Sequence, residues 1–374
     1  MRIGILTFHK AHNFGAVLQC YATQEALKSM GFTVEVIDYQ PKYLISPYKI
    51  FNIKRFKTKK PLLLVRRIIV EVLLLKDRIA RYNNFERFIN NRLQLSKPII
   101  GNNIPSNYDA YVLGSDQIWN PIITNGFDKV FFGAFPKDSP DTPVISYAAS
   151  METTSLNEDD KKYYTSALNN FTAISVRESQ LAELLAPITP KPIECVLDPS
   201  LLVSRSIWDK LCTPNQYGKY ILIYQVRRTN NIYRIAHQIA KERNCKVIEI
   251  PAFLQYKRKS KRQAEEYKEY APEQFISMIR NAECIVTSSF HGTSFSIIFN
   301  KPFYTIEIGD NADTRSKSLL TSLNLLERMI PQDGNITFTP IDFTEANQKL
   351  NSLRISSMEF LKKSLKGGAP NVKR

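Results

Sequence analysis

The chain has 374 residues, 43% of them hydrophobic and 23% charged, and its formal net charge is +16. This length suffices for two domains of ordinary size, and the apolar and aromatic content excludes a largely disordered protein. The five cysteines form no CxxC pair, and no HExxH motif or Cys/His cluster accompanies the four histidines. We therefore expect reduced thiols, no disulfide framework and no metal site.

The first half of the chain alternates between strand-like and helix-like segments. Residues 2–8 predict a strand, 16–30 a helix ended by Gly31, and 33–38 a second strand, a βαβ unit of the parallel type. Since the chain begins directly with this strand, no signal peptide is visible and we expect a cytoplasmic protein. Further strands are predicted at 110–114, 143–148, 171–176 and 193–197, with helices at 157–169 and 178–186.

A second alternating series starts near Lys219. Its predicted strands cover 219–226, 246–250, 283–287 and 302–307, and its predicted helices cover 230–243, 272–281, 292–299, 315–325 and 343–366. The pattern favours an α/β protein with two Rossmann-like domains that face each other across a cleft. We expect an N-terminal domain over residues 1–203, a C-terminal domain over 204–342, and a terminal helix and tail over 343–374.

The positive charge is concentrated in two clusters. Residues 51–92 hold twelve Lys or Arg against three acidic residues, a net charge of +9, and residues 257–262 add five positive charges in six positions. Basic clusters attract polyanions. A non-catalytic nucleic-acid-binding protein is disfavoured because neither cluster belongs to a recognisable reader motif. We expect no nucleic-acid partner.

The segment 61–81 is amphipathic when it is placed on a helical wheel. Its uninterrupted apolar runs reach four residues, which is too short to span a bilayer. The segment fits an interfacial helix that lies on an anionic membrane, and it equally fits a helix packed on its own domain with a solvated charged face. The residues expected to share the apolar face are Leu64, Val65, Ile68, Ile69, Val72, Leu75 and Ile79.

The most informative motif follows the predicted strand at 283–287, where Ser288, Ser289, His291, Gly292 and Thr293 form a turn into a helix. Such a turn directs backbone N–H groups and the positive end of the helix at one point, which suits a phosphate or carboxylate. We expect Gly292 to allow a ligand close to the backbone, and His291 to act as a cation or proton donor. The alternative is a capped helix with a structural histidine.

Polar residues also follow the first predicted strand, where His9, Asn13 and Gly15 precede a helix. Open α/β sheets bind ligands at the carboxyl ends of their strands, so this loop is a candidate cleft wall. A single glycine excludes the dinucleotide-binding GxGxxG pattern, and Asn13 is also expected to cap the helix.

Two further strand ends carry candidate residues. Ser115, Asp116 and Gln117 follow one strand, and Asp116 either orients a sugar hydroxyl, acts as a base or caps the next turn. Arg177 follows another strand and either holds a carboxylate or phosphate, or forms a structural ion pair. Asp198 is expected to be structural.

Five segments, in this order along the chain, together resemble the polysaccharide pyruvyl transferase family: residues 9–21, 114–120, 175–178, 196–199 and 288–292. The resemblance implies a GT-B-like arrangement of two Rossmann-like domains. It also implies an enzyme without a cofactor that transfers a pyruvyl group from phosphoenolpyruvate to a sugar hydroxyl pair. The product is a pyruvate ketal in a bacterial surface polysaccharide, such as an exopolysaccharide or capsule.

The resemblance also assigns roles. His291 becomes the general acid or phosphate partner, Arg177 the anion clamp, and Asn13, Asp116 and Gln117 face the acceptor sugar or the donor. Some family members carry an arginine two positions before this histidine, where the chain has Ser289. The second cation must then come from the backbone or from one of three residues, Arg315, Lys317 and His9.

Two further interpretations remain. An acceptor linked to polyprenyl diphosphate would favour peripheral contact with the inner membrane face through residues 51–92. The rival function is a GT-B glycosyltransferase with a nucleotide-sugar donor. Against it, the acidic residue expected to bind a ribose, Asp38, belongs to the first half of the chain rather than to the donor half.

Overall fold

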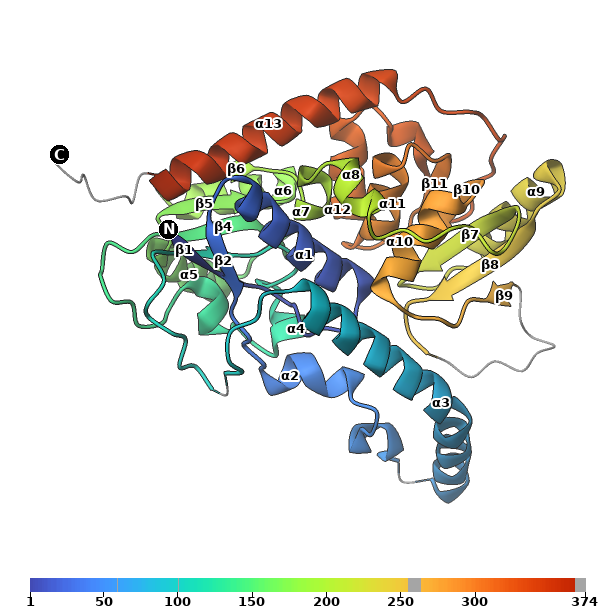
Figure 1. The fold of residues 1–374 in the computed structure, drawn as a ribbon, viewed down its shortest axis with the longest axis horizontal. Coiled ribbons are helices and arrows are strands. Elements are labelled where there is room, and N and C mark those ends of the chain that lie inside the picture. The colour runs from blue at the N-terminus through green and yellow to red at the C-terminus, as the bar shows by residue number, and fades with distance from the viewer. Residues whose placement is uncertain (59, 100, 255–263, 367–374) are drawn as a thin grey trace.

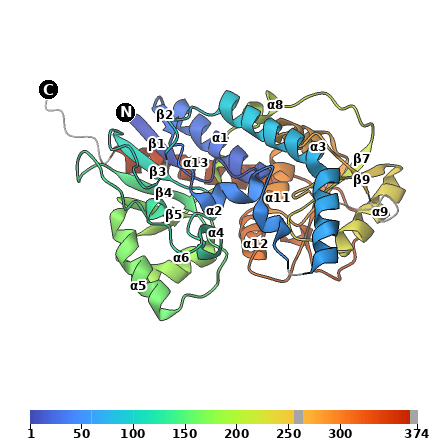
Figure 2. The same ribbon diagram turned by 90° about the horizontal axis from the view of Figure 1, so that it is seen from below.

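The computed structural model describes residues 1–58, 60–99, 101–254 and 264–366. In these residues the chain forms two parallel sheets of six strands each, with helices packed around them (Figure 1). The basic cluster predicted at 257–262 lies outside the described residues. Figure 2 shows the two sheets in separate halves of the molecule, as the alternating pattern predicted.

The first sheet has the strand order β2-β1-β3-β4-β5-β6. The order reverses between β1 and β3, so a crevice opens at the carboxyl ends of these two strands. Its strands are β1 (Arg2–Leu6), β2 (Thr33–Val36), β3 (Ala110–Leu113), β4 (Val144–Ala149), β5 (Ala173–Val176) and β6 (Ile193–Cys195). Its helices are α1 (Phe14–Ser29), α2 (Lys42–Ile45), α3 (Pro61–Arg92), α4 (Pro121–Thr124), α5 (Glu158–Ala167) and α6 (Ser179–Leu185).

The second sheet has the order β12-β11-β10-β7-β8-β9 and reverses between β7 and β10. Its strands are β7 (Tyr220–Gln225), β8 (Lys246–Pro251), β9 (Glu265–Glu266), β10 (Cys284–Thr287), β11 (Phe303–Ile306) and β12 (Met329–Ile330). The helices of this half are α8 (Arg205–Asp209), α9 (Asn231–Arg243), α10 (Pro272–Asn281), α11 (Phe290–Ile298) and α12 (Asp313–Ser322). Two further helices, α7 (Pro199–Leu202) and α13 (Thr344–Lys366), contact both halves.

The predicted strands all form, and the differences lie in helix starts and short elements. Helices α1 and α11 each begin two residues before the predicted start, because Asn13 and Ser289 cap them by accepting hydrogen bonds from backbone N–H groups. The sequence analysis did not identify the two-residue strands β9 and β12 or the short helices α2, α4, α7 and α8. Each spans at most five residues, too few for a periodic hydrophobic pattern.

The two halves share one hydrophobic core. A single cluster of buried side chains includes residues of β1, α1 and α7 together with residues of β7, α10 and α11. At its centre the ring of Phe14, from α1, stacks on that of Phe275, from α10, with centroids 4.8 Å apart. This shared core holds the two sheets in a defined relation.

The terminal helix α13 returns to the first half of the molecule (Figure 1). The Ser357 hydroxyl accepts a hydrogen bond from the backbone N–H of Leu197 at 3.0 Å, and Arg354 Nε donates to the Leu201 carbonyl at 2.9 Å. The helix also packs the ring of Phe360 near Tyr147 of β4. The C-terminal segment therefore spans both halves.

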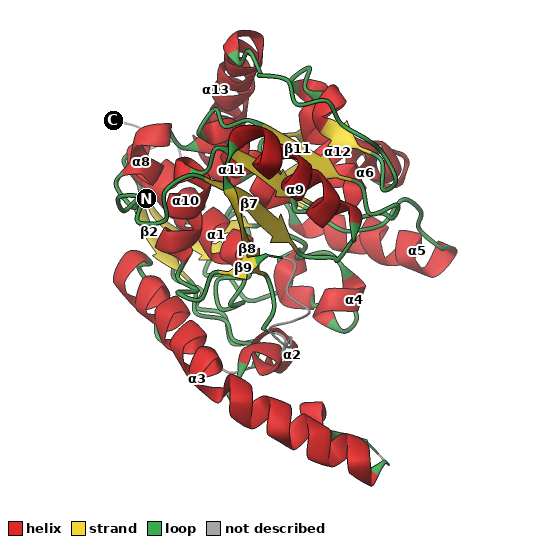
Figure 3. Ribbon diagram, turned by 90° about the vertical axis from the view of Figure 1, so that its right-hand side faces the viewer, coloured by secondary structure: helices red, strands yellow, loops and turns green. Residues whose placement is uncertain are grey.

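Helix α3 is longer than the amphipathic segment considered above, and its N-terminal part extends away from the rest of the molecule (Figure 3). Five of the seven residues predicted for its apolar face are exposed: Val65, Ile68, Ile69, Val72 and Ile79. Glu71 and Arg78, from its charged side, are instead partly buried and form an ion pair. The interpretation of a helix packed on its own domain with a solvated charged face is therefore wrong. No helix among the described residues is long and apolar enough to cross a bilayer.

Arg81 anchors the C-terminal part of α3 to both halves. Its guanidinium donates hydrogen bonds to the carbonyls of His12 (2.9 Å), Pro251 (3.4 Å) and Ala252 (2.9 Å). It also lies over the rings of Phe14 and Phe85 at 5.0 and 4.9 Å. Arg81 is itself buried, so it donates these hydrogen bonds within the protein interior.

We predict that Arg81→Met lowers the free energy of unfolding by about 3 kcal/mol, since it removes the three hydrogen bonds that Arg81 donates. Chemical denaturation measures the change. The control is Arg87→Met, at an exposed position of the same helix, which should change stability by less than about 0.5 kcal/mol. Equal effects of the two substitutions would contradict the anchoring role.

Candidate active site

The reversal points of the two sheets face a common cleft of about 610 Å³. Its walls come from the loops after β1, β3, β7 and β10 and from the start of α12. In doubly wound sheets, ligands bind at the carboxyl ends of the strands where the order reverses. Two such points on one cleft identify it as the candidate active site.

His291 lies in the first turn of α11, at the junction of the two halves. It lines the cleft and is buried. A Cβ atom added to Gly15 would lie 2.0 Å from its Nδ1, so only glycine permits this approach of α1 to the imidazole. Its Nε2 is buried without a hydrogen-bond partner in the described part of the chain and lies 3.8 Å from Asp198 Oδ2.

The packing around Gly292 differs from the expectation that this glycine allows a ligand close to the backbone. A Cβ atom at this position would lie 2.2 Å from Thr287 Oγ1, so the glycine allows α11 to pack on β10 rather than admitting a ligand. Thr293 is also buried, and its hydroxyl hydrogen-bonds with the Thr305 hydroxyl at 2.7 Å. Both residues shape the turn without lining the cleft.

Arg177 lies beneath the cleft between two carboxylates. It donates to Asp198 Oδ2 at 2.7 Å and to Glu178 Oε1 at 3.1 Å, and its guanidinium carbon lies 4.5 Å from the centre of the Phe290 ring. Its Nη2 is buried and has no partner among the described residues. The ion-pair interpretation of Arg177 is correct, and one N–H group nevertheless remains available.

Asp198 connects this ion pair to His291. Its Oδ2 accepts hydrogen bonds from Arg177 and from the Ser115 hydroxyl at 3.3 Å. Its Oδ1 accepts from the Ser200 backbone N–H at 2.9 Å and caps α7. The residue is therefore structural, as expected, but its contact with His291 was not anticipated.

Arg315, from α12, lines the cleft. The Gln117 amide is best oriented to accept a hydrogen bond from its Nη1 at 3.1 Å, and Nη2 lies 3.9 Å from Glu152. Its Nε is buried and, within the described residues, has no partner. Of the three side chains proposed for the second cation, Arg315 is the one that reaches the cleft.

The other two do not reach it. His9 is fully buried, and its Nε2 pairs with Asp38 at 2.7 Å. Lys317 is exposed and is not among the residues that line the cleft. The predicted residues that line the cleft are Asn13, Asp116, Gln117, Ser288, Ser289, His291 and Arg315. Those packed behind them are Gly15, Ser115, Arg177, Gly292 and Thr293.

Burial controls the protonation of the site. It lowers the pKa of His291 below its usual value of 6.5, although the Asp198 carboxylate opposes the shift. The pKa of Arg177 is raised because Glu178 and Asp198 outweigh its burial, whereas burial raises the pKa of Glu178. Burial therefore favours a neutral imidazole at His291, while the neighbouring carboxylates favour the charged form of Arg177.

Arg227, which follows β7, also lines the cleft and was not among the predicted site residues. It forms ion pairs with Glu152 and Asp310, two other residues of the cleft wall. The rule that selected Arg177, an arginine directly after a strand, could have selected it. No group of three or more His, Cys, Asp or Glu side chains in the described ranges could hold a metal ion.

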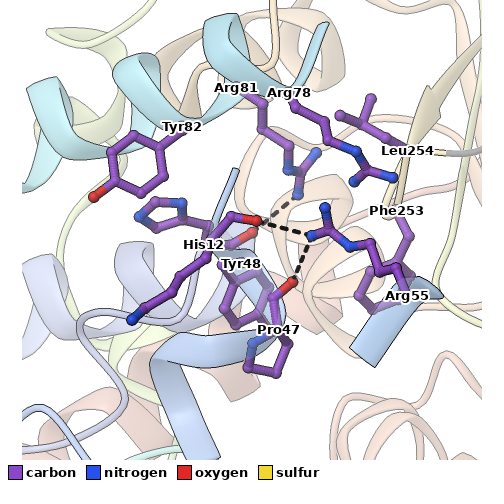
Figure 4. A pocket seen from close by; sticks show the side chains of 10 residues that line it. His12, Pro47, Tyr48, Arg55, Arg78, Arg81, Tyr82, Phe253 and Leu254 are labelled. Carbon is purple, nitrogen blue, oxygen red and sulfur yellow. Dashed lines mark hydrogen bonds between the residues drawn. The ribbon is translucent and has the colours of Figure 1, made fainter. Parts of the chain in front are cut away.

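A second cavity of about 230 Å³ adjoins the cleft and shares Tyr48 and Phe253 with it. Figure 4 shows the side chains of Arg55, Arg78 and Arg81 together in this cavity. Among the ion pairs of the described residues, Arg55 and Arg78 share a single carboxylate: Glu71 lies 3.1 Å from Arg55 and 2.7 Å from Arg78. The cavity therefore carries a net positive charge.

The lowered pKa values of two histidines predict that the free energy of unfolding decreases as the pH is lowered. Burial lowers the pKa of His12 as well as that of His291, so below pH 6.5 the unfolded chain binds more protons than the folded chain. The free energy of unfolding should therefore decrease from about pH 7 to about pH 5.5. His291→Gln should make this decrease smaller by about 1 kcal/mol.

Urea titrations at the two pH values measure this difference. His237→Gln, at an exposed position of α9, is the control for loss of a histidine. The same decrease in wild type and His291→Gln would show that His291 does not resist protonation in the folded protein.

Comparison with known proteins places the chain in a family. The family model described as polysaccharide pyruvyl transferase matches residues 13–311. A comparison with curated protein sequences gives no match.

Two solved structures resemble the chain along most of their length. The UDP-GlcNAc 2-epimerase from Neisseria meningitidis bound to UDP-GlcNAc has 12% identity and a TM-score of 0.47, with 98% of this chain and 94% of that chain covered. The glycosyltransferase SnogD from Streptomyces nogalater has 9% identity and a TM-score of 0.41, with 98% of each chain covered. The family match covers the cleft loops after β3, β7 and β10, and this chain belongs to the polysaccharide pyruvyl transferase family.

Proposed function

We propose that the protein transfers a pyruvyl group from phosphoenolpyruvate to two hydroxyls of a sugar, forming a pyruvate ketal. The observation that carries this proposal is that two residues lining the cleft, His291 and Arg315, each have a buried nitrogen atom, Nε2 and Nε, without a partner among the described residues. Arg177, packed behind the cleft, has a third such atom, Nη2. Buried N–H groups without partners are costly, so the site is organised for a ligand that satisfies them. A small donor with a carboxylate and a phosphate suits them.

The reaction requires a proton and a stabilised cationic carbon. Protonation of the methylene carbon of phosphoenolpyruvate makes it a methyl group and leaves a cationic centre next to the carboxylate. One sugar hydroxyl attacks this centre and loses its proton, and the C–O bond to phosphate then breaks. The second hydroxyl attacks the same carbon and loses its proton, which closes the ketal. Of the two protons released, one replaces the proton consumed and the other leaves with the phosphate. The site can hold the carboxylate and phosphate through the two arginines and the start of α11.

His291 is the candidate proton donor. Burial lowers the pKa of its imidazole, which favours the neutral form. A bound phosphate or carboxylate raises the pKa of a neighbouring imidazole, since the opposite charge favours the protonated form. We infer that donor binding charges His291, which then acts as general acid.

Asn13, Asp116 and Gln117 face the acceptor sugar in this proposal. They line the part of the cleft formed by the first sheet. The cleft volume of about 610 Å³ leaves room for a sugar beside a small donor. We assign the reaction to the biosynthesis of exopolysaccharide or capsule in the cytoplasm, on an acceptor linked to polyprenyl diphosphate at the inner membrane face.

The rival function is a glycosyltransferase that uses a nucleotide-sugar donor. The acid considered for a ribose, Asp38, is bound to His9 Nε2 at 2.7 Å and to Gln40 at 2.9 Å, and it does not line the cleft. This pairing supports phosphoenolpyruvate. A response to UDP-sugars and none to phosphoenolpyruvate would favour the rival.

We predict that Arg315→Met weakens phosphoenolpyruvate binding at least about tenfold, because it removes a charged donor from the cleft surface. Calorimetric titration measures the dissociation constant, with UDP-sugars as ligand controls. Lys317→Met is the matched control, since it removes the same charge from the exposed side of the same helix. If both variants bind like wild type, Arg315 does not contact the donor.

We also predict that phosphoenolpyruvate binding takes up about one proton per site above the lowered pKa of His291. Titrations in two buffers with different ionisation enthalpies measure this uptake. His291→Gln should bind with a smaller uptake. Equal uptake in both proteins would assign the proton to another group and overturn the role of His291 as general acid.

A further inference from the structure

The exposed side of helix α3 carries a continuous row of large apolar side chains, which we call the apolar stripe. These side chains are 45% to 87% exposed: Leu62, Val65, Ile68, Ile69, Val72 and Leu73. Phe51 and Ile53, just before the helix, are 75% and 87% exposed. So large a contiguous apolar surface marks an interaction site rather than ordinary surface.

The stripe is exposed because charged residues on the other side of the helix form contacts within the protein. Glu71 accepts hydrogen bonds from Arg55 and Arg78, and Arg67 donates to the carbonyls of Arg55 and Lys57. These contacts fix which side of α3 faces the preceding segment. As a result, the apolar stripe faces the solvent.

The same exposed side changes character where α3 reaches the body of the protein. Toward its C-terminal end, the exposed positions carry polar side chains, Asn83, Arg87 and Asn90. Here the helix is anchored by Arg81, Phe85 and Phe88, which are buried. The apolar surface is therefore confined to the projecting part of the helix (Figure 3).

Positive charge surrounds the stripe. Lys57, Lys60, Arg66 and Lys76 are exposed in this segment. The two acidic residues between positions 51 and 80, Glu71 and Asp77, are only 17% and 21% exposed and are both ion-paired. An apolar row flanked by cations, without an exposed acid in the described part of this segment, complements an anionic lipid surface.

A second copy of the chain suits the stripe less well. Pairing two such helices would bring the lysines and arginines of one copy near those of the other, with no exposed carboxylate from this segment to balance them. An anionic bilayer supplies both the apolar interior and the balancing charge. Charge complementarity therefore selects lipid.

We propose that the projecting part of α3 docks the protein on an anionic membrane, with the apolar stripe inserted at the level of the headgroups. The stripe and Ile79 span about 25 Å along the helix, which suits an interfacial helix lying in the membrane plane. The cationic cavity of Arg55 and Arg78 adjoins the active-site cleft. In the docked protein this cavity would lie between the membrane-bound helix and the cleft. This inference rests on the membrane-linked acceptor of the proposed function and names the surface that reaches it.

The test is co-sedimentation of the purified protein with phosphatidylcholine vesicles that contain or lack phosphatidylglycerol, at low ionic strength. We expect wild type to bind the anionic vesicles. Replacing Val65, Ile69 and Val72 together with Gln should weaken binding at least tenfold, because Gln keeps the helix and the charge but removes the apolar surface. The matched control is Ile355→Gln, at an apolar position of α13 that is 61% exposed.

Circular dichroism confirms that the variants are folded, and sedimentation equilibrium gives their oligomeric state. The proposal would be overturned if the wild-type protein did not bind anionic vesicles. It would also be overturned if the triple variant bound them as tightly as wild type. A wild-type dimer that the triple substitution dissociates would overturn it as well, because a second copy would then cover the stripe. Phosphoenolpyruvate binding by the triple variant, measured calorimetrically, separates failure of docking from failure of the proposed reaction.

Discussion

The close contact between Gly15 and His291 sets the geometry of the cleft. The first turn of α1 and the first turn of α11 meet so closely that a Cβ atom at Gly15 would lie 2.0 Å from the imidazole Nδ1. Each helix follows a strand next to the reversal point of its own sheet. This contact, supported by the stacking of Phe14 on Phe275, brings both ligand-binding sheet edges to one cavity.

The electrostatics of the site follow from this burial. Arg177 is neutralised by Asp198 and Glu178, while Arg315 is shared between Gln117 and Glu152. Both arginines and His291 nevertheless keep a buried nitrogen without a partner among the described residues. Preorganised donors of this kind stabilise an anion without the cost of reorienting the protein during the reaction.

Helix α3 joins two surfaces that serve different purposes. Its C-terminal part is held by Arg81 against carbonyls from both halves, and its N-terminal part offers apolar side chains to the surroundings. A helix can do both because its inward side changes from charged contacts with residues 46–58 to apolar contacts with the core. The anchoring and the proposed docking therefore lie on one rigid element next to the cleft.

Much of the architecture could be predicted from the sequence. The period-two strands and the helices between them, the cap at Asn13 and the turn at Ser288–Gly292 are local patterns. These patterns predicted two parallel sheets and placed Asn13, Asp116, Gln117 and His291 at strand ends. Strand ends of a doubly wound sheet share one edge, so their grouping followed as well.

Only the tertiary structure decided which cation joins His291 and which way α3 faces. Arg315, Lys317 and His9 are similar candidates in sequence, and they differ in whether a distant partner, such as Asp38 for His9, holds them away from the cleft. A helical wheel likewise shows that α3 has two unlike sides without showing which side packs. The sequence determined the local periodicity, because that depends on neighbours along the chain; burial and partner choice depend on residues far apart in sequence, which only the folded chain brings together.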